Sequence, residues 1–287
     1  MLIALIADVH ANILALEAVL KSIRQKRPDK ILSLGDQVNL GPCPRETLDL
    51  LKAENVHCLH GNHERYILSA MQGDPAYSGA NFASLRYNAS LLQEQDIRFE
   101  KTYQLDGITF CHALPEDDRF PVNDPSRALP LLREMRFDSP THILCGHGHN
   151  PIHYQLPGLR LNGIGSLGCM DEGAPGTSTY TLLLLEGKEA VLMPYSVHYD
   201  VRPLRERFLS SGMAEFCPIM AHIICLQMTY NRDFLVGFVT LAGRIAASKG
   251  EASISPETWQ QADARFPWPD GIGTSAFWKR DAGGVTT

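Results

Sequence analysis

Short apolar runs alternate with helix-like patterns over the first half of the chain. Five of these runs have the length expected of buried strands, and each is followed closely by a cluster of Asp, Asn, His or Gly. The runs cover residues 2–7, 30–34, 56–59, 108–111 and 142–145. The pattern predicts that chemically active side chains follow the ends of several strands.

Helical spacing separates the early strands. Residues 13–23 place apolar side chains on one face after Asn12, which is a suitable N-cap, and Pro44 begins a second helix that carries Leu48 and Leu51. Alternation of strands and helices indicates a parallel sheet covered by helices. In such sheets ligands bind at the carboxyl ends of the strands, where the five polar clusters fall.

The pattern changes after residue 155. Strand-like runs at residues 159–162, 179–186 and 189–195 are joined by turns rich in Gly and Pro, which predicts a second sheet or a sheet edge. From about residue 200 the apolar spacing becomes helical. We therefore expect an α/β domain over residues 1–199 and a helical C-terminal extension over residues 200–287, packed on the core or on a partner subunit.

Composition narrows the class of protein. The chain has 287 residues, 44% of them hydrophobic and 20% charged, which is typical of a soluble globular protein. The formal net charge of -6 makes a nucleic-acid polymer an unlikely partner. Apolar stretches are too short for a membrane span, and the first residues lack a basic leader. With seven cysteines and no CxxC pair, we expect a cytoplasmic protein.

The polar clusters suggest a metal site. Asp8 and His10 are two positions apart, as are His147 and His149, so on an extended segment both members of each pair would point the same way. Carboxylate, amide and imidazole ligands suit Mn, Fe, Co, Ni or Zn. Each motif alone is as well explained by a turn or a hydrogen-bonded histidine. Their occurrence together at five strand ends favours metal binding.

The ordered motifs resemble those of the calcineurin-like metallophosphoesterase superfamily. The series reads Asp8-x-His10, Gly35-Asp36, Gly61-Asn62-His63-Glu64, His112 and Gly146-His147-x-His149. The spacing Gly41-Pro42-x-Pro44 and the stretch at residues 162–168 are similar to its compact bacterial phosphodiesterase-like branch. The resemblance covers about residues 1–199. It implies a four-layer αββα sandwich with two sheets packed face to face.

The resemblance also implies a set of site residues. One divalent metal ion would be held by Asp8, His10 and His149, the second by Asn62, His112 and His147, with Asp36 bridging both. A shared carboxylate reduces the repulsion between two cations, and the remaining positive charge attracts a phosphate. A metal-bridging hydroxide would attack phosphorus. The unligated His63 would be the catalytic histidine beside Asp36.

Several assignments stay open at this stage. Asn39 and Arg65 are candidates for contacting a phosphate, and Glu64 either orients an imidazole or is an acidic residue at a helix N-terminus. The substrate is expected to be a small phosphorylated molecule, either a phosphodiester, a phosphomonoester or a nucleotide-type anhydride. The alternatives are a phosphoprotein phosphatase and a non-catalytic metallophosphoesterase-like scaffold that binds proteins. The extension could also mediate homo-oligomer formation.

Overall fold

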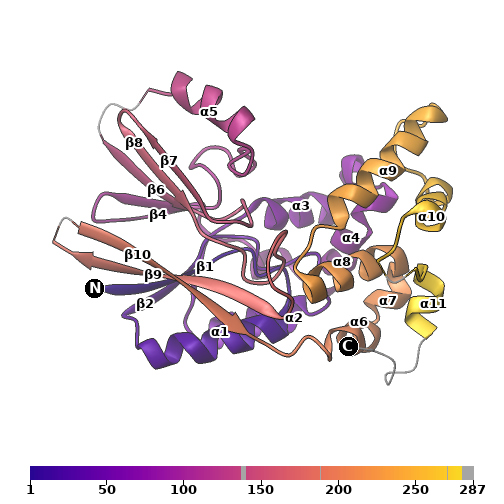
Figure 1. Cartoon of the computed structure of the whole chain (residues 1–287), viewed down its shortest axis with the longest axis horizontal. Helices are drawn as coiled ribbons and strands as arrows, with labels where there is room; N and C mark the ends of the chain where they lie inside the picture. The colour runs from indigo at the N-terminus through magenta and orange to yellow at the C-terminus, as the bar shows by residue number, and fades with distance from the viewer. Residues whose placement is uncertain (137–139, 188, 270, 280–287) are drawn as a thin grey trace.

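Two mixed sheets form the centre of the molecule. The structure, a computed structural model, describes residues 1–136, 140–187, 189–269 and 271–279. In these residues, two five-stranded sheets pack face to face and helices cover their outer faces (Figure 1). This arrangement confirms the predicted αββα sandwich. The last residues of the predicted extension, 280–287, lie outside the described residues.

The first sheet contains the N-terminal strand at its centre. Its order is β10-β9-β1-β2-β3. The strands are β1 (Leu2–Ile6), β2 (Lys30–Ser33), β3 (His57–Cys58), β9 (Thr177–Glu186) and β10 (Glu189–His198). β1, β2 and β3 are parallel, whereas β9 runs antiparallel to both of its neighbours. The carboxyl ends of β1 and β2 therefore lie at the same edge.

The second sheet has the order β4-β5-β6-β8-β7. Its strands are β4 (Thr102–Leu105), β5 (Ile108–Cys111), β6 (Thr141–Cys145), β7 (Ile152–Leu156) and β8 (Leu159–Gly163). The central strands β5, β6 and β8 are parallel. Both strands that the sequence missed, β4 and β7, lie at the edges. An edge strand has a neighbour on one side only and carries polar residues, so its apolar pattern is weak.

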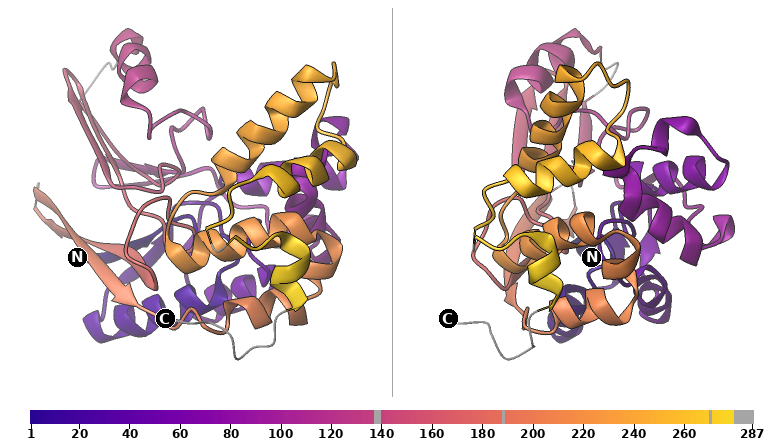
Figure 2. Two further views of the ribbon diagram at one scale, coloured as in Figure 1. Left: turned by 45° about the vertical axis from the view of Figure 1, so that its right-hand side comes forward. Right: turned by 90° about the vertical axis from the view of Figure 1, so that its right-hand side faces the viewer.

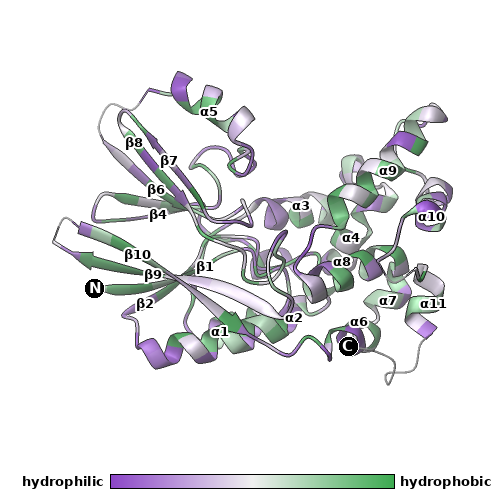
Figure 3. Cartoon of the chain, in the orientation of Figure 1, coloured by the Kyte–Doolittle hydropathy of each residue, from purple (hydrophilic) through white to green (hydrophobic). Residues whose placement is uncertain are grey.

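Strict alternation along β1 separates two parts of the core. Ile3 and Leu5 face the second sheet and pack with Phe110 and Leu144, whereas Ile6 faces the helices on the other side. Figure 3 shows the hydrophobic character of β1 and β9. Each such fully buried side chain contributes about 1.5–3 kcal/mol. The period of two is therefore sufficient to fix which face of the strand meets the other sheet.

Helices close both outer layers. The first sheet is covered by α1 (Ile13–Lys26) and α2 (Pro44–Ala53), and the second by α5 (Pro125–Glu134). The predicted N-cap is confirmed, because Asn12 Oδ1 accepts a hydrogen bond from Ala15 N. The predicted start of the second helix at Pro44 is also confirmed.

The remaining helices gather at one end of the sandwich, next to the end of β1 (Figures 1 and 2). They are α3 (Asn62–Met71), α4 (Ala83–Leu91), α6 (Leu204–Ser210), α7 (Met213–Phe216), α8 (Pro218–Tyr230), α9 (Leu235–Ser248), α10 (Pro256–Arg265) and α11 (Thr274–Lys279). Three short 3₁₀ helices at Pro75–Tyr77, Ala80–Phe82 and Glu94–Asp96 flank α4 within the described chain.

The predicted helical extension is centred on α8, in which ten of thirteen residues are buried. A helix that is buried all round forms the core of its region. That core includes Leu40, Tyr87 and Cys169 from the preceding part of the chain. The extension therefore packs on the sandwich, while a domain boundary at residue 200 stays a prediction.

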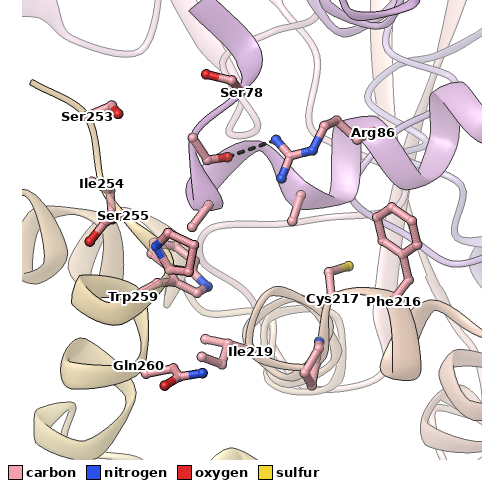
Figure 4. Close-up of a pocket in the computed structure, with 15 residues that line it drawn as sticks. Ser78, Arg86, Phe216, Cys217, Ile219, Ser253, Ile254, Ser255, Trp259 and Gln260 are labelled. Atoms are coloured by element: carbon pink, nitrogen blue, oxygen red, sulfur yellow. Dashed lines mark hydrogen bonds between the residues drawn. The ribbon is translucent and has the colours of Figure 1, made fainter.

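A cavity of about 470 Å³ lies between α4, α8 and α10. Its walls include Ile219 and Trp259, together with Arg86, whose Nη1 donates to Gly79 O at 2.9 Å (Figure 4). None of its lining residues belongs to the predicted metal site. In the described part of the chain, no helix is long and apolar enough to cross a bilayer.

Candidate metal centre

The predicted ligands follow five strands whose ends lie at the same edge of the sandwich, and Asn62 is the ligand that follows β3. Asp8 and Asp36 follow β1 and β2 of the first sheet, and His112 and His147 follow β5 and β6 of the second. His147 N donates to both carboxylate oxygens of Asp8, at 3.1 and 3.2 Å. His10 N donates to Asp36 O at 3.0 Å. Backbone hydrogen bonds thus join loops from both sheets at one point.

Five of the predicted ligands have a left-handed backbone, and four of them belong to the pairs Asp8/His10 and His147/His149, which the sequence placed on extended segments. The φ angles are 53° for Asp8, 50° for His10, 57° for Asp36, 62° for His147 and 54° for His149. This conformation costs a non-glycine residue about 1–2 kcal/mol. The extended interpretation was wrong because these residues form tight turns directly after their strands. Strained backbone concentrated in one cluster is typical of a functional site.

Two glycines of the motifs are required by close contacts. Gly35 has a φ of 102°, and a Cβ there would lie 2.5 Å from His112 Nδ1. A Cβ on Gly61 would lie 2.2 Å from Asp36 Oδ1. Both distances are far below van der Waals contact. The loops can approach each other this closely only because these two positions have no side chain.

The structure brings the predicted ligand atoms together. In the described chain, three groups have donor atoms within 4.8 Å of one another: Asp8, His10 and His149; Asp36, His112 and His147; and His10, Asp36 and His63. The first two groups correspond to the two predicted metal sites, without Asn62. The third group places the predicted catalytic histidine beside the predicted bridging carboxylate.

Short distances connect these groups. His10 Nε2 and His149 Nε2 are 3.2 Å apart. His112 Nε2 lies 3.2 Å from Asp36 Oδ2 and 2.8 Å from Asn62 Oδ1. Asn62 therefore lies beside the second group. All seven predicted ligands lie in one cluster.

Hydrogen bonds made by the Nδ1 atoms orient two of the imidazoles. His112 Nδ1 lies 2.8 Å from Leu34 O, and His149 Nδ1 lies 3.1 Å from Asp171 Oδ1. Carbonyl and carboxylate oxygens only accept, so both Nδ1 atoms carry the proton. Each Nε2 is then directed at the cluster with a free lone pair when the ring is neutral. This is the arrangement of metal-binding histidines.

The two carboxylates are buried among imidazoles, and in the described chain no Lys or Arg forms an ion pair with either. Asp8 and Asp36 are 0% and 1% exposed. Burial raises the pKa of Asp8 to about 6. Against the effect of burial, the ring of His112 holds the pKa of Asp36 well below its usual range. A bound cation would supply the missing positive charge, so the donor set fits a metal.

The imidazoles titrate over an unusually wide range. Although burial opposes it, the Asp36 carboxylate raises the pKa of His112 to about 10. Burial also opposes the charge on His149, but its hydrogen bond to Asp171 raises the pKa to about 9. Burial lowers the pKa of His147 to about 3. Such divergent values in one cluster mark a functional site.

His63 lies at the open side of the cluster. Its side chain is 20% exposed and its Nε2 lies 3.8 Å from Asp36 Oδ2. Its backbone N donates to Asp36 Oδ1 at 2.8 Å. Asn39 Nδ2 lies 2.6 Å from His63 Nδ1. Burial lowers the pKa of the ring. With the Asn39 amide donating to Nδ1, the neutral ring carries its proton on Nε2, toward the cluster.

Glu64 holds the loop that carries Asp36. Its carboxylate accepts from the backbone N of Asp36 at 3.0 Å, of Gln37 at 2.8 Å, of Val38 at 3.3 Å and of Gly61 at 2.8 Å. Gly61 is the N-cap of α3, and an acidic side chain in the first turn of a helix typically accepts this hydrogen bond from the N-cap backbone N. Of the two interpretations, the helix N-terminal acid is therefore confirmed.

Arg65 forms an ion pair at the edge of the site. Its Nε and Nη2 donate to the carboxylate of Asp118, at 2.8 and 2.7 Å. The pair lines a cavity of about 260 Å³ that also contacts His60, Lys101 and His112. The cavity thus adjoins the cluster of predicted ligands through His112. A phosphate contact by Arg65 or Asn39 stays a prediction.

The family follows from comparison with known proteins. Residues 1–181 match the family model described as calcineurin-like phosphoesterase. The chain belongs to this family. It is thereby identified as a metallophosphoesterase-type protein, as the motifs predicted, in a family of hydrolases that bind divalent metals. The seven ligand assignments stay predictions.

Relatives across most of the chain share the fold. The chain is 22% identical to the uncharacterised protein MJ0912 of Methanocaldococcus jannaschii over 235 residues, 75% of this chain and 95% of that protein. A metallophosphoesterase structure from Sphaerobacter thermophilus has a TM-score of 0.59 at 22% identity, covering 80% of this chain and all of that one. The structure of the hypothetical protein PH1004 from Pyrococcus horikoshii has a TM-score of 0.60 at 18% identity, covering 81% of this chain and 99% of that one.

Sequence reasoning missed two residues of the calcineurin-like site. Asp171, on the loop after β8, accepts a hydrogen bond from His149 Nδ1. Asp118 forms an ion pair with Arg65. Neither residue belongs to one of the motifs. Neither comes directly after an apolar run, which is the pattern by which the ligands were predicted. Only the folded chain brings them to the cluster.

Proposed function

We propose that this protein is a two-metal phosphoesterase that hydrolyses a phosphodiester, phosphomonoester or nucleotide-type phosphoanhydride. The observation that carries the proposal is the pair of ligand groups, Asp8–His10–His149 and Asp36–His112–His147, each with donor atoms within 4.8 Å. Family membership supports the reaction class. Asn62 completes the second group through its contact with His112.

In this proposal the chain holds the ions with two carboxylates, one amide and four imidazoles. Asp36 is the bridging residue because its Oδ2 faces the rings of His10 and His112 from the two groups. Two divalent cations carry more charge than Asp8 and Asp36 neutralise, so the loaded site attracts an anion. When bound, two such cations would supply a hydroxide from water and would polarise the phosphoryl oxygens. Mn, Fe, Zn, Ni and Co all suit these ligands.

His63 is the proposed catalytic residue. Its ring is held from one side by Asn39 and its Nε2 faces the cluster, so it donates a hydrogen bond to a phosphoryl oxygen or to the departing oxygen. The donation requires the proton on Nε2, which the contact with Asn39 maintains. The substrate phosphate reaches the cluster from the side on which His63 and His149 are 20% and 16% exposed.

A small phosphorylated molecule is the proposed substrate. The ligands other than His147 and His149 are at most 3% exposed, so only the rim of the cluster meets solvent. A recessed site favours a small ester over a flat protein surface.

All seven cysteines are free, which supports the proposal of a reducing, cytoplasmic compartment.

The test combines metal analysis with hydrolysis of a chromogenic diester and its matching monoester, with and without added Mn. We expect two bound ions per chain, hydrolysis that chelation abolishes, and restoration by Mn. Asp36→Ala should bind no more than one ion and lose turnover. Full metal content and full activity in Asp36→Ala would overturn the bridging assignment. A metal-loaded wild type that cleaves neither ester would favour the scaffold alternative.

A further inference from the structure

The loop after β8 connects the metal cluster to the C-terminal helices. Asp171 lies on this loop, and its Oδ1 accepts two hydrogen bonds: one from His149 Nδ1 at 3.1 Å and one from Gln227 Nε2 at 3.0 Å. Gln227 is on α8, 56 positions further along the chain. A single carboxylate oxygen therefore joins a predicted metal ligand to the helical extension.

Gln227 is fixed at both ends of its amide. The side chain is 2% exposed, and its Oε1 accepts from Phe234 N at 3.4 Å and from Leu235 N at 3.3 Å, where α9 begins. Its Nε2 is thereby directed away from α9 and toward Asp171. The amide cannot rotate without losing partners on both sides.

The turn between α8 and α9 also holds the backbone of the loop. Asp233 N donates to Asp171 O at 3.0 Å. Asn231 Nδ2 lies 2.7 Å from both Ala174 O and Thr177 O. The position of the Asp171 carboxylate is thus set by the C-terminal helices as well as by its own loop.

A second contact joins the C-terminal end of α8 to the loop after β1. The hydroxyl of Tyr199 donates to Met228 O at 3.1 Å and accepts from Asn12 Nδ2 at 3.2 Å. Asn12 caps α1 two positions after His10. Tyr199 therefore links the C-terminal end of α8 to the residue that caps α1.

We propose that Gln227 and Asp171 are positioning residues that orient His149 and set the affinity for the cation held by Asp8, His10 and His149. A carboxylate that accepts from Nδ1 fixes the tautomer of a metal-binding imidazole and makes its Nε2 a better ligand. The inference rests on the proposed metal centre. It assigns the C-terminal helices a role in metal binding, as part of the centre's support.

The test titrates Mn into metal-free, full-length protein and follows the two binding events by calorimetry. Loss of such a support weakens metal binding about 10–100-fold. Gln227→Leu and Asp171→Ala should weaken one event by this factor and leave the other unchanged. Asp171→Asn keeps an oxygen that accepts both hydrogen bonds, so its affinity should lie between those of Asp171→Ala and the wild type.

Thr274→Val is the matched control. Thr274 is also a buried polar residue of the helical region, and its Oγ1 contacts His222 and Asp263 rather than the metal cluster. Thermal unfolding of each metal-free variant measures the purely structural cost. Thr274→Val should lower the unfolding temperature without changing either Mn affinity.

Three outcomes are decisive. Selective weakening of one event in the Gln227 and Asp171 variants, with Thr274→Val unchanged, supports the inference. Two wild-type binding events that persist unchanged in Gln227→Leu and Asp171→Ala overturn the inference alone, as does equal weakening by Thr274→Val. A wild-type protein that binds no Mn, Zn, Fe, Ni or Co overturns the proposed function and the inference together.

Discussion

His10 Nε2 and His149 Nε2 lie 3.2 Å apart although the residues are 139 positions apart in the chain. Two imidazole nitrogens that bind one cation at about 2.0–2.1 Å are roughly 2.8–3.4 Å apart, from neighbouring octahedral positions at the lower end to tetrahedral positions at the upper end. The observed spacing falls in that interval. The loops after β1 and β6 are thus already placed at the separation that a shared ion requires.

Replacement of His63 should separate catalysis from metal binding. His63→Gln replaces the imidazole with an amide, which cannot transfer a proton, and changes none of the seven predicted ligands. We expect kcat to fall about 10²–10⁴-fold, the contribution typical of a positioned acid, while two ions remain bound. Steady-state kinetics on the diester, with metal analysis of the same sample, checks this. Wild-type kcat in His63→Gln would exclude the ring from the reaction.

Asn39 should act through His63. Its φ of 71° is one that glycine adopts freely, so Asn39→Gly removes the amide without straining the backbone. Because the His63 ring is then no longer oriented, kcat should fall about tenfold, while KM and metal content stay near wild type. Asn55→Gly is the control, since Asn55 is exposed and has a φ of 53°. Equal losses in the two variants would contradict the assigned role of Asn39.

Glu64→Ala should destabilise the loop that carries Asp36. The change leaves four backbone N–H groups without their acceptor, and each buried unpaired donor costs about 1–3 kcal/mol. We expect the free energy of unfolding to fall by about 3 kcal/mol or more. Denaturant unfolding of the metal-free protein measures it. Glu17→Ala, at an exposed position of α1, should change little, and a similar small effect in Glu64→Ala would refute the prediction.

His222 should make the helical region sensitive to acid. The ring stacks with Trp268 and Phe277, at centroid distances of 4.1 and 4.0 Å, and burial lowers its pKa to about 3. The unfolded chain takes up this proton below about pH 6.5 and the folded chain does not. Stability is therefore full above pH 6.5 and falls by up to about 1.4 kcal/mol per pH unit down to pH 3.

His222→Phe keeps an aromatic ring in that stack and removes the titration. As the pH falls from 7 to 4, the free energy of unfolding of the wild type should therefore decrease relative to that of the variant. Chemical denaturation at a series of pH values follows this difference. A difference that stays constant across the interval would show that His222 does not cause the acid sensitivity.

Local patterns were sufficient to predict much of the fold. The apolar runs predicted β1, β2, β5 and β6, and the cap at Asn12 predicted where α1 begins. They succeeded because burial on a strand or helix face leaves a period in the sequence. The polar edge strands β4 and β7 lack that period and were missed.

The site was predictable only where its residues follow strands. Asp8 and His147 were found in this way, but their left-handed backbone was not, because it results from contacts between loops of the two sheets. Asp171 and Gln227 contact the site across 22 and 56 positions respectively. No local pattern encodes such contacts, since they depend on how the C-terminal helices pack against the sandwich.

In the proposed metal centre, seven side chains hold two cations on either side of Asp36. Anomalous diffraction from crystals soaked in Mn tests it most directly. We expect two peaks, one among Asp8, His10 and His149 and the other among Asn62, His112 and His147, with the Asp36 carboxylate between them. A map with no anomalous peak in contact with Asp36, at Mn concentrations that saturate activity, would contradict it.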